Sequence, residues 1–320
     1  MFGIEFYEIL LFLRQLGLAT VGAASLWGAV FLLKKQHVLA QKLLWIFFSA
    51  LSLFLFAWIA LALYTCAFCA EAHEGILLAP AFETLKYAMR EQFFVLSALA
   101  LWGIAGFFII IVKPKFLKKS INLHYFYGAS FLFVSILLLY PWGDTESLRH
   151  SVFFSLHAWH SVLTLGTVIV VDFLFASLKR THASFLQKIF PQMTKAIWLG
   201  LGLDFLSSGL IFDEAFAITP KLLFTQTLVG IIIINGAFLS GPIMRAAFSA
   251  QKPLKIAAVS GSISIVGWFS ITALDTFRSL IFGYFELVVI YIAFVITVYC
   301  FYEIIEKLLL RNLWPKHLSE

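Results

Sequence analysis

Three histidines lie close together in the segment RHSVFFSLHAWHS: His150, His157 and His160. On a helix, residues seven and three positions apart lie on nearly the same face, so we expect the three imidazoles to point in similar directions. At 1.5 Å per residue they cover a depth of about 15 Å. Imidazole is the commonest transition-metal ligand and also titrates near neutral pH. The segment predicts metal or heme ligands, with proton transfer or buried, hydrogen-bonded histidines as the alternatives.

A pair of thiols occurs in the motif Cys66-Ala-Phe-Cys69. On a helix, side chains three positions apart are close enough to bind one soft metal ion. In an oxidising compartment the same thiols can instead form a disulfide. We treat Cys66, Cys69 and the nearby His73 as auxiliary metal ligands. Because the chain has only four methionines, a copper site in it would depend on cysteine and histidine.

A second set of polar residues, Asp172, Asp204 and Asn235, lies within long apolar stretches. Such side chains are costly inside a membrane span and by default indicate a functional site. At related depths on consecutive spans they predict a proton or cation relay, and neutral, hydrogen-bonded structural groups are the alternative. Arg14 also lies inside an apolar stretch, so it needs a partner such as Glu8, an acid on another span or an anionic ligand.

Three further acids, Asp213, Glu214 and Asp275, are near the ends of apolar stretches on the side where His157 is expected. A metal-bound histidine usually donates its other ring N–H to such a group, so these acids are candidates for orienting the histidines. Heme b held by two histidines needs them on two elements at matching depth. Only His73 could pair with His150 or His157, which disfavours a four-helix core with two hemes and leaves a single heme as an alternative.

The composition predicts the helices that position these residues. Of the 320 residues, 62% are hydrophobic and only 12% are charged. A soluble domain of this length cannot bury so much apolar surface, and the long runs exclude an outer-membrane barrel. The composition also excludes a disordered chain, a nucleic-acid-binding domain and a disulfide-stapled secreted module. We therefore predict an all-α polytopic membrane bundle with nine spans, at about 9–33, 43–67, 92–112, 125–141, 152–178, 196–216, 222–244, 256–276 and 285–305.

The distribution of positive charge predicts the orientation. Of the 23 Lys and Arg residues, 17 lie in the C-terminal tail and in the connectors after spans 1, 3, 5 and 7, and five lie on the opposite side. Lys and Arg are enriched in cytoplasmic connectors. We expect the N-terminus outside, the C-terminus in the cytoplasm and the chain in a bacterial inner membrane.

The chain divides most naturally at the connector PWGDTESLRH. We expect residues 1–145 to form a four-span bundle with an outer connector at 69–91, and residues 146–320 to form a five-span bundle. Thr20, Ala24 and Gly28 place small side chains at four-residue spacing in the first span. Small faces let helices approach closely in lipid, so this face predicts helix packing.

The stretch SLHAWHSVLTLGTVIVVDFLF resembles the bacterial copper-resistance CopD-like membrane proteins and their uncharacterised relatives. The later stretches TKAIWLGLGLDFLSSGLIF, PKLLFTQTLVGIIIINGAFLSGPIM and SGSISIVGWFSITAL are similar to the spans that follow in that family. The resemblance covers about residues 150–300. It implies an inner-membrane bundle in which His157 is the matching family histidine, and copper passage as the role.

Taken with the polar residues, these patterns predict a membrane protein that binds a transition metal or heme near its outer face. It would move metal ions or electrons inward, and it would receive them from a periplasmic donor. Copper and heme b are the cofactors we expect. The alternatives are a proton-coupled transporter of a small solute and a structural subunit of a membrane complex. The sequence contains no decisive catalytic motif, which favours a protein that is not an enzyme.

Overall fold

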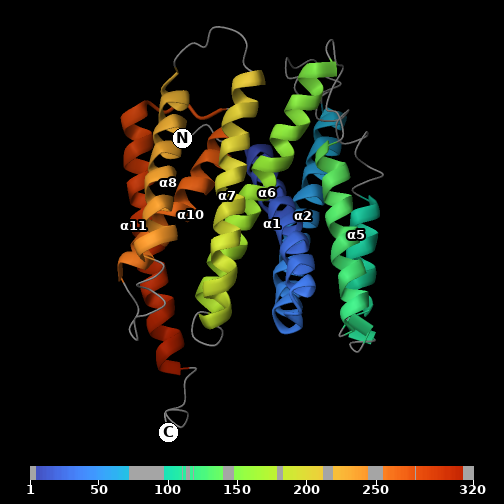
Figure 1. The fold of residues 1–320 in the computed structure, drawn as a ribbon. Coiled ribbons are helices and arrows are strands. Elements are labelled where there is room, and N and C mark those ends of the chain that lie inside the picture. The colour runs from blue at the N-terminus through green and yellow to red at the C-terminus, as the bar shows by residue number, and fades with distance from the viewer. Residues whose placement is uncertain are drawn as a thin grey trace. The chain divides into compact units, whose positions relative to one another are not determined.

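A computed structural model of the chain describes residues 5–71, 97–109, 111–112, 116–117, 119–139, 148–178, 183–211, 219–243, 255–277 and 279–312. Every regular element named within these ranges is helical, which confirms the predicted all-α class (Figure 1). The helices are α1 (Phe6–Leu33), α2 (His37–Glu71), α5 (Ser120–Leu139), α6 (Leu148–Leu178), α7 (Ala183–Ile211), α8 (Pro220–Phe238), the π-helical turn η2 (Leu239–Ile243), α10 (Lys255–Thr276) and α11 (Tyr284–Asn312).

Seven of the described helices are long and apolar enough to cross a membrane. They come from α1, α2, α5, α6, α8, α10 and α11, and the segment Ser97–Ile109 is a shorter apolar helix. The α7 helix is not among the seven, and its N-terminal half contains Lys188, Pro191 and Lys195. The chain thus has the character of a multi-pass membrane protein, while nine spans and the orientation of the termini stay predictions.

Two helices in the region of the histidines extend beyond the predicted spans. The α6 helix is described from Leu148, before the span expected from about 152, and α7 is described from Ala183, before the span expected from about 196. The extra N-terminal residues of α7 form an amphipathic helix in which Ile189, Phe190 and Met193 are buried. Hydropathy alone does not find this segment, because its exposed face is polar.

The chain forms two compact units, and α6 and α7 contribute to both. Among the described residues, the first unit contains those within Glu5–Phe173 and Gln192–Ala215, and the second contains those within Leu174–Pro191 and Phe216–Glu320. Trp27 on α1 and Ser135 on α5 make hydrogen bonds to α6, so α6 packs with helices that precede it in the chain. The division expected at residue 145 stays a prediction.

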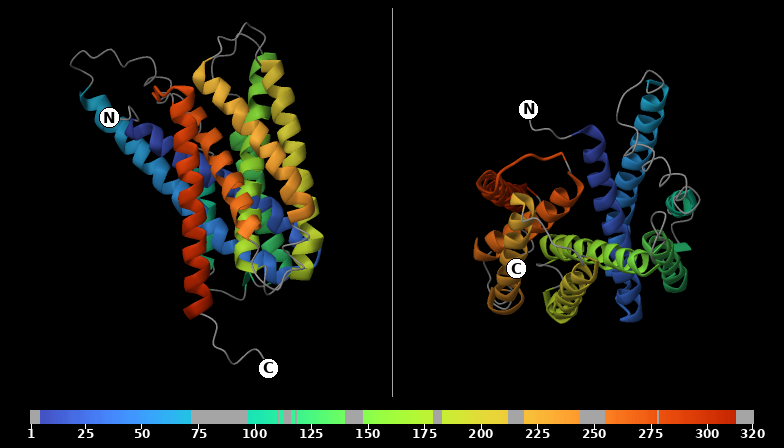
Figure 2. Two further views of the ribbon diagram at one scale, coloured as in Figure 1. Left: turned by 90° about the vertical axis from the view of Figure 1, so that its left-hand side faces the viewer. Right: turned by 90° about the horizontal axis from the view of Figure 1, so that it is seen from above.

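The α1 helix is central to the first unit. It runs beside α2 along much of its length (Figure 2), and the predicted small face of Thr20, Ala24 and Gly28 is buried. The α6 helix approaches α1 closely at Gly166, where a Cβ atom would overlap the backbone carbonyl of Ala19. In lipid, such close contacts supply the packing energy that the hydrophobic effect supplies in water.

Hydrogen bonds between helices reinforce this packing. The indole N–H of Trp27 on α1 donates to Thr167 Oγ1 on α6 over 3.2 Å. Trp159 on α6 donates to Ser135 Oγ on α5 over 3.1 Å. An indole N–H without a hydrogen-bond acceptor is costly in apolar surroundings. Each of these hydrogen bonds therefore favours the packing of the two helices that it joins.

The second unit contains α8, α10 and α11 (Figure 1). Its core includes Phe224, Leu228 and Tyr291. Asn235 on α8 and Ser260 on α10 make two reciprocal hydrogen bonds: the amide Nδ2 donates to the Ser260 carbonyl over 2.8 Å, and Ser260 Oγ donates to Asn235 Oδ1 over 2.5 Å. Asn235 therefore joins two helices.

The connection between α1 and α2 contains a strained residue. Lys35 has a φ of 60° and occupies the left-handed position of a Schellman motif, in which Gln36 N–H bonds to the Phe31 carbonyl and Lys35 N–H bonds to the Leu32 carbonyl. Glycine adopts this conformation without the Cβ penalty.

We expect Lys35→Gly to raise the free energy of unfolding in detergent by about 1 kcal/mol. Lys34→Gly, where φ is −86°, is the control and should give no gain; equal effects would contradict the assignment of strain.

Candidate metal centre

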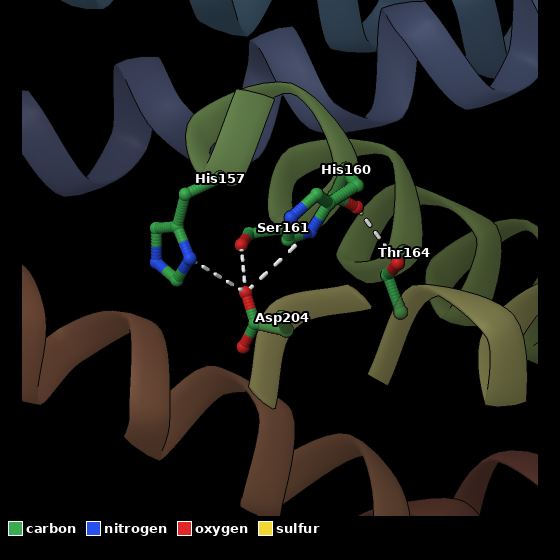
Figure 3. A network of polar contacts seen from close by, with 5 residues as sticks. All are labelled: His157, His160, Ser161, Thr164 and Asp204. Atoms are coloured by element: carbon green, nitrogen blue, oxygen red, sulfur yellow. Dashed lines mark hydrogen bonds and ion pairs between the residues drawn. The ribbon is translucent and has the colours of Figure 1, made fainter. Parts of the chain in front are cut away.

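Two histidines on α6 and one aspartate on α7 meet inside the first unit (Figure 3). His157 Nδ1 lies 3.3 Å from Asp204 Oδ1, and His160 Nδ1 lies 3.6 Å from the same oxygen. The two imidazole rings are 5.5 Å apart between centroids and nearly perpendicular, at 80°. One potential ligand atom from each residue lies within 4.8 Å of the others. We refer to His157, His160 and Asp204 as the triad.

The neighbouring turns of α6 hold the triad in place. Ser161 Oγ donates a short hydrogen bond to Asp204 Oδ1, so the carboxylate is oriented by the residue next to His160. Thr164 Oγ1 donates to the His160 carbonyl over 2.7 Å (Figure 3). Both hydroxyls lie on the face of α6 that meets α7.

The triad is closed on one side and open on the other. The His160 side chain keeps 8% of its surface exposed, whereas the side chains of His157 and Asp204 keep 30% and 36%. An ion bound between them would be held against a buried imidazole while one side stayed accessible. Such an arrangement suits an exchangeable ion better than a permanently enclosed structural one.

No protein-family model, curated protein or solved structure matches this chain. The triad and its surroundings are therefore interpreted from their chemistry alone.

Three charged candidates of the first unit stand apart from the triad in their contacts. Asp172 lies on α6, and its Oδ2 atom is buried with no hydrogen-bond partner in the described part of the molecule. Arg14 lies on α1 and forms no ion pair with the described acids. Glu8, a predicted partner for Arg14, instead caps its own helix by accepting a hydrogen bond from the Glu5 N–H over 3.3 Å.

The remaining predicted site residues are not brought to the triad by the described structure. Asn235 and Asp275 belong to the second unit, where Asn235 pairs with Ser260 and Asp275 is exposed on α10. His150 lies in α6, and Cys66 and Cys69 lie in the last turns of α2, but their side chains are outside the described set. His73, Asp213 and Glu214 are outside the described residues.

Asp204 contacts the two histidines, a contact that its position in the sequence does not predict. The sequence places Asp204 in a deeper relay and favours other acids for orienting the imidazoles. The register between the two helices brings these side chains together: Thr164, four residues after His160, lies against Gly200, four residues before Asp204. Hydropathy gives no signal for this register.

Proposed function

We propose that this chain is a multi-pass membrane protein that binds a transition-metal ion at His157, His160 and Asp204 and passes metal ions or electrons inward. The observation that carries the proposal is the spacing within the triad. The two N···O distances, 3.3 and 3.6 Å, exceed the usual range of an N–H···O hydrogen bond. Ligands about 2.0–2.1 Å from a tetrahedral ion lie about 3.4 Å from each other. Two distances between potential ligand atoms in the triad are therefore close to the ligand–ligand distances of an occupied tetrahedral site.

The ligand types narrow the choice of ion. Two imidazoles and one carboxylate suit borderline divalent ions such as Zn²⁺, Co²⁺, Fe²⁺ and Cu²⁺ and leave a position open for water or exchange. Soft Cu(I) prefers sulfur ligands, which none of the triad residues supplies. Copper passage, which the CopD-like resemblance implies, would therefore use Cu²⁺ at this site.

The triad supports a metal ion better than heme b. Axial ligands of one heme approach the iron from opposite faces of the porphyrin. His157 and His160 are three residues apart on one helix, with ring centroids 5.5 Å apart, so a porphyrin has no room between them. Only one of the two could ligate a heme.

Inward movement would use the buried acid further along α6. Asp172 lies 15 residues beyond His157, which corresponds to about 22 Å along the helix axis. The positive-inside bias places this end of the span toward the cytoplasm. In this proposal the triad receives the ion from a periplasmic donor, and Asp172 stabilises positive charge deeper in the bundle of a bacterial inner-membrane protein.

The proposal is tested by titrating chelator-treated, detergent-purified protein with Co²⁺ as a spectroscopic substitute for Zn²⁺. We expect stoichiometric binding with the visible bands of tetrahedral Co²⁺, and no Soret band. His157→Ala should abolish the bands, whereas His124→Ala, which removes a half-buried histidine on α5, should keep them. In proteoliposomes His157→Ala should also lose metal uptake. A wild-type protein that binds no metal would overturn the proposal and favour the transporter or structural-subunit alternatives.

A further inference from the structure

One turn away from the triad, α6 and α7 approach each other closely at Thr164 and Gly200. Gly200 is buried, and a Cβ atom added to it would overlap Thr164 Oγ1. The hydroxyl is itself fixed, because it donates to the His160 carbonyl over 2.7 Å. The two helices therefore touch through a glycine on one side and an immobilised hydroxyl on the other. We call this pair the helix contact.

The helix contact and the triad are about one helical turn apart along the interface between α6 and α7. Thr164 follows His160 by four residues, and Gly200 precedes Asp204 by four residues, so each step is close to one helical turn. The distance from Asp204 to the imidazoles depends on how closely the backbones approach one turn away. Packed helices transmit such displacements because interiors are dense and stiff.

We propose that the helix contact determines which divalent ions the triad accepts, an inference that rests on the proposed metal binding. It holds α6 and α7 at a spacing that suits bonds of about 2.0–2.1 Å, as Zn²⁺ forms with nitrogen and oxygen. In a tetrahedral site each 0.1 Å added to those bonds lengthens the ligand–ligand edges by roughly 0.16 Å. A larger ion of the same charge, such as Cd²⁺, therefore needs the helices further apart.

The test separates the helices with a single methyl group. Gly200→Ala forces Thr164 and the α7 backbone apart by on the order of 1 Å, since non-bonded atoms prefer separations of about 3.5–4.0 Å. Gly202→Ala is the matched control, because a Cβ atom at Gly202, two residues along the same helix, meets no atom within 4 Å. The readout is the ratio of Cd²⁺ to Zn²⁺ dissociation constants measured by competition. We expect Gly200→Ala to shift the ratio toward Cd²⁺ by about tenfold or more, and Gly202→Ala to keep the wild-type ratio.

A compensating substitution distinguishes spacing from general damage. Thr164→Ala removes the hydroxyl and the methyl group of Thr164 and leaves only its Cβ atom, 2.9 Å from the added methyl group. The double variant Thr164→Ala/Gly200→Ala should therefore return part of the way to the wild-type ratio. Thr164→Val, which leaves Gly200 intact and puts a methyl group in place of the hydroxyl, should shift the ratio in the same direction as Gly200→Ala. If Gly200→Ala does not fold, Thr164→Val tests whether the helix contact controls the Cd²⁺/Zn²⁺ ratio.

The outcomes separate this inference from the proposal beneath it. A wild-type protein that binds neither ion would overturn both. Binding of Zn²⁺ by all variants with an unchanged Cd²⁺/Zn²⁺ ratio would overturn the role of the helix contact while leaving the metal site in place. A changed ratio that the double variant moves no closer to the wild-type value would also contradict it, because the helix contact would then not be the cause.

Discussion

Asp204→Ala should weaken metal binding by at least about 100-fold, because both short ligand–ligand distances in the triad end on Asp204 Oδ1. Loss of a group that merely orients a ligand costs about 10–100-fold in metal affinity, and loss of a ligand should cost no less than the upper end of that range. The measurement is a competition titration with a chromophoric chelator in detergent. Asp275→Ala removes an exposed carboxylate on α10 and should leave the affinity unchanged.

A second substitution at the same residue separates charge from packing. Asp204→Asn keeps the size of the side chain and an oxygen that can accept the hydrogen bond from Ser161, but it removes the negative charge. We expect it to bind metal nearly as weakly as Asp204→Ala while keeping the stability of the wild-type protein. Wild-type metal affinity in either variant would mean that the triad is a hydrogen-bonded structural cluster.

Gly166→Ala should cause a large loss of stability through a single added methyl group. The new Cβ would overlap the backbone carbonyl of Ala19, and a backbone atom cannot rotate away as a side chain can. Overpacking in a dense core costs about 1–3 kcal/mol, and we expect the upper end of that range in the free energy of unfolding. The loss is measurable by reversible denaturation in mixed detergent micelles.

Gly128→Ala is the matched control for this change. Gly128 is on α5 in the same unit, and a Cβ atom added there meets no atom within 4 Å. Because alanine favours helix by about 1 kcal/mol over glycine, this variant should be as stable as the wild type or slightly more so. Equal stability of the two variants would contradict the close packing of α1 against α6.

Fold class and the grouping of the histidines were predictable from the sequence. The apolar runs are far longer than those of soluble proteins, so they identify membrane helices even when their exact ends are misplaced. The spacing of His157 and His160 places them on one helix face by geometry alone. The buried face of Thr20, Ala24 and Gly28 follows from the same periodicity, and the structure confirms it.

The pairing of Asp204 with the histidines was not predictable from hydropathy, because it depends on the register between α6 and α7. Hydropathy places the outer ends of these spans near 152 and 216, which puts His157 five residues deep and Asp204 twelve. In the structure the two side chains lie at the same level, because His157 Nδ1 is 3.3 Å from Asp204 Oδ1. Apolar runs do not encode the register between two packed helices, and this register brings the side chains into contact.

The hydrogen bond between Trp27 and Thr167 also has a consequence for the order of assembly in the cell. The two residues are separated by 140 positions, so the acceptor leaves the ribosome long after the donor has entered the membrane. Until α6 is inserted, the indole N–H of Trp27 lacks this acceptor and Ala19 lacks its contact with Gly166. The packing of α1 therefore stays incomplete until α6, made well after it, closes onto it, and the first unit is complete only when the C-terminal part of α7 has followed.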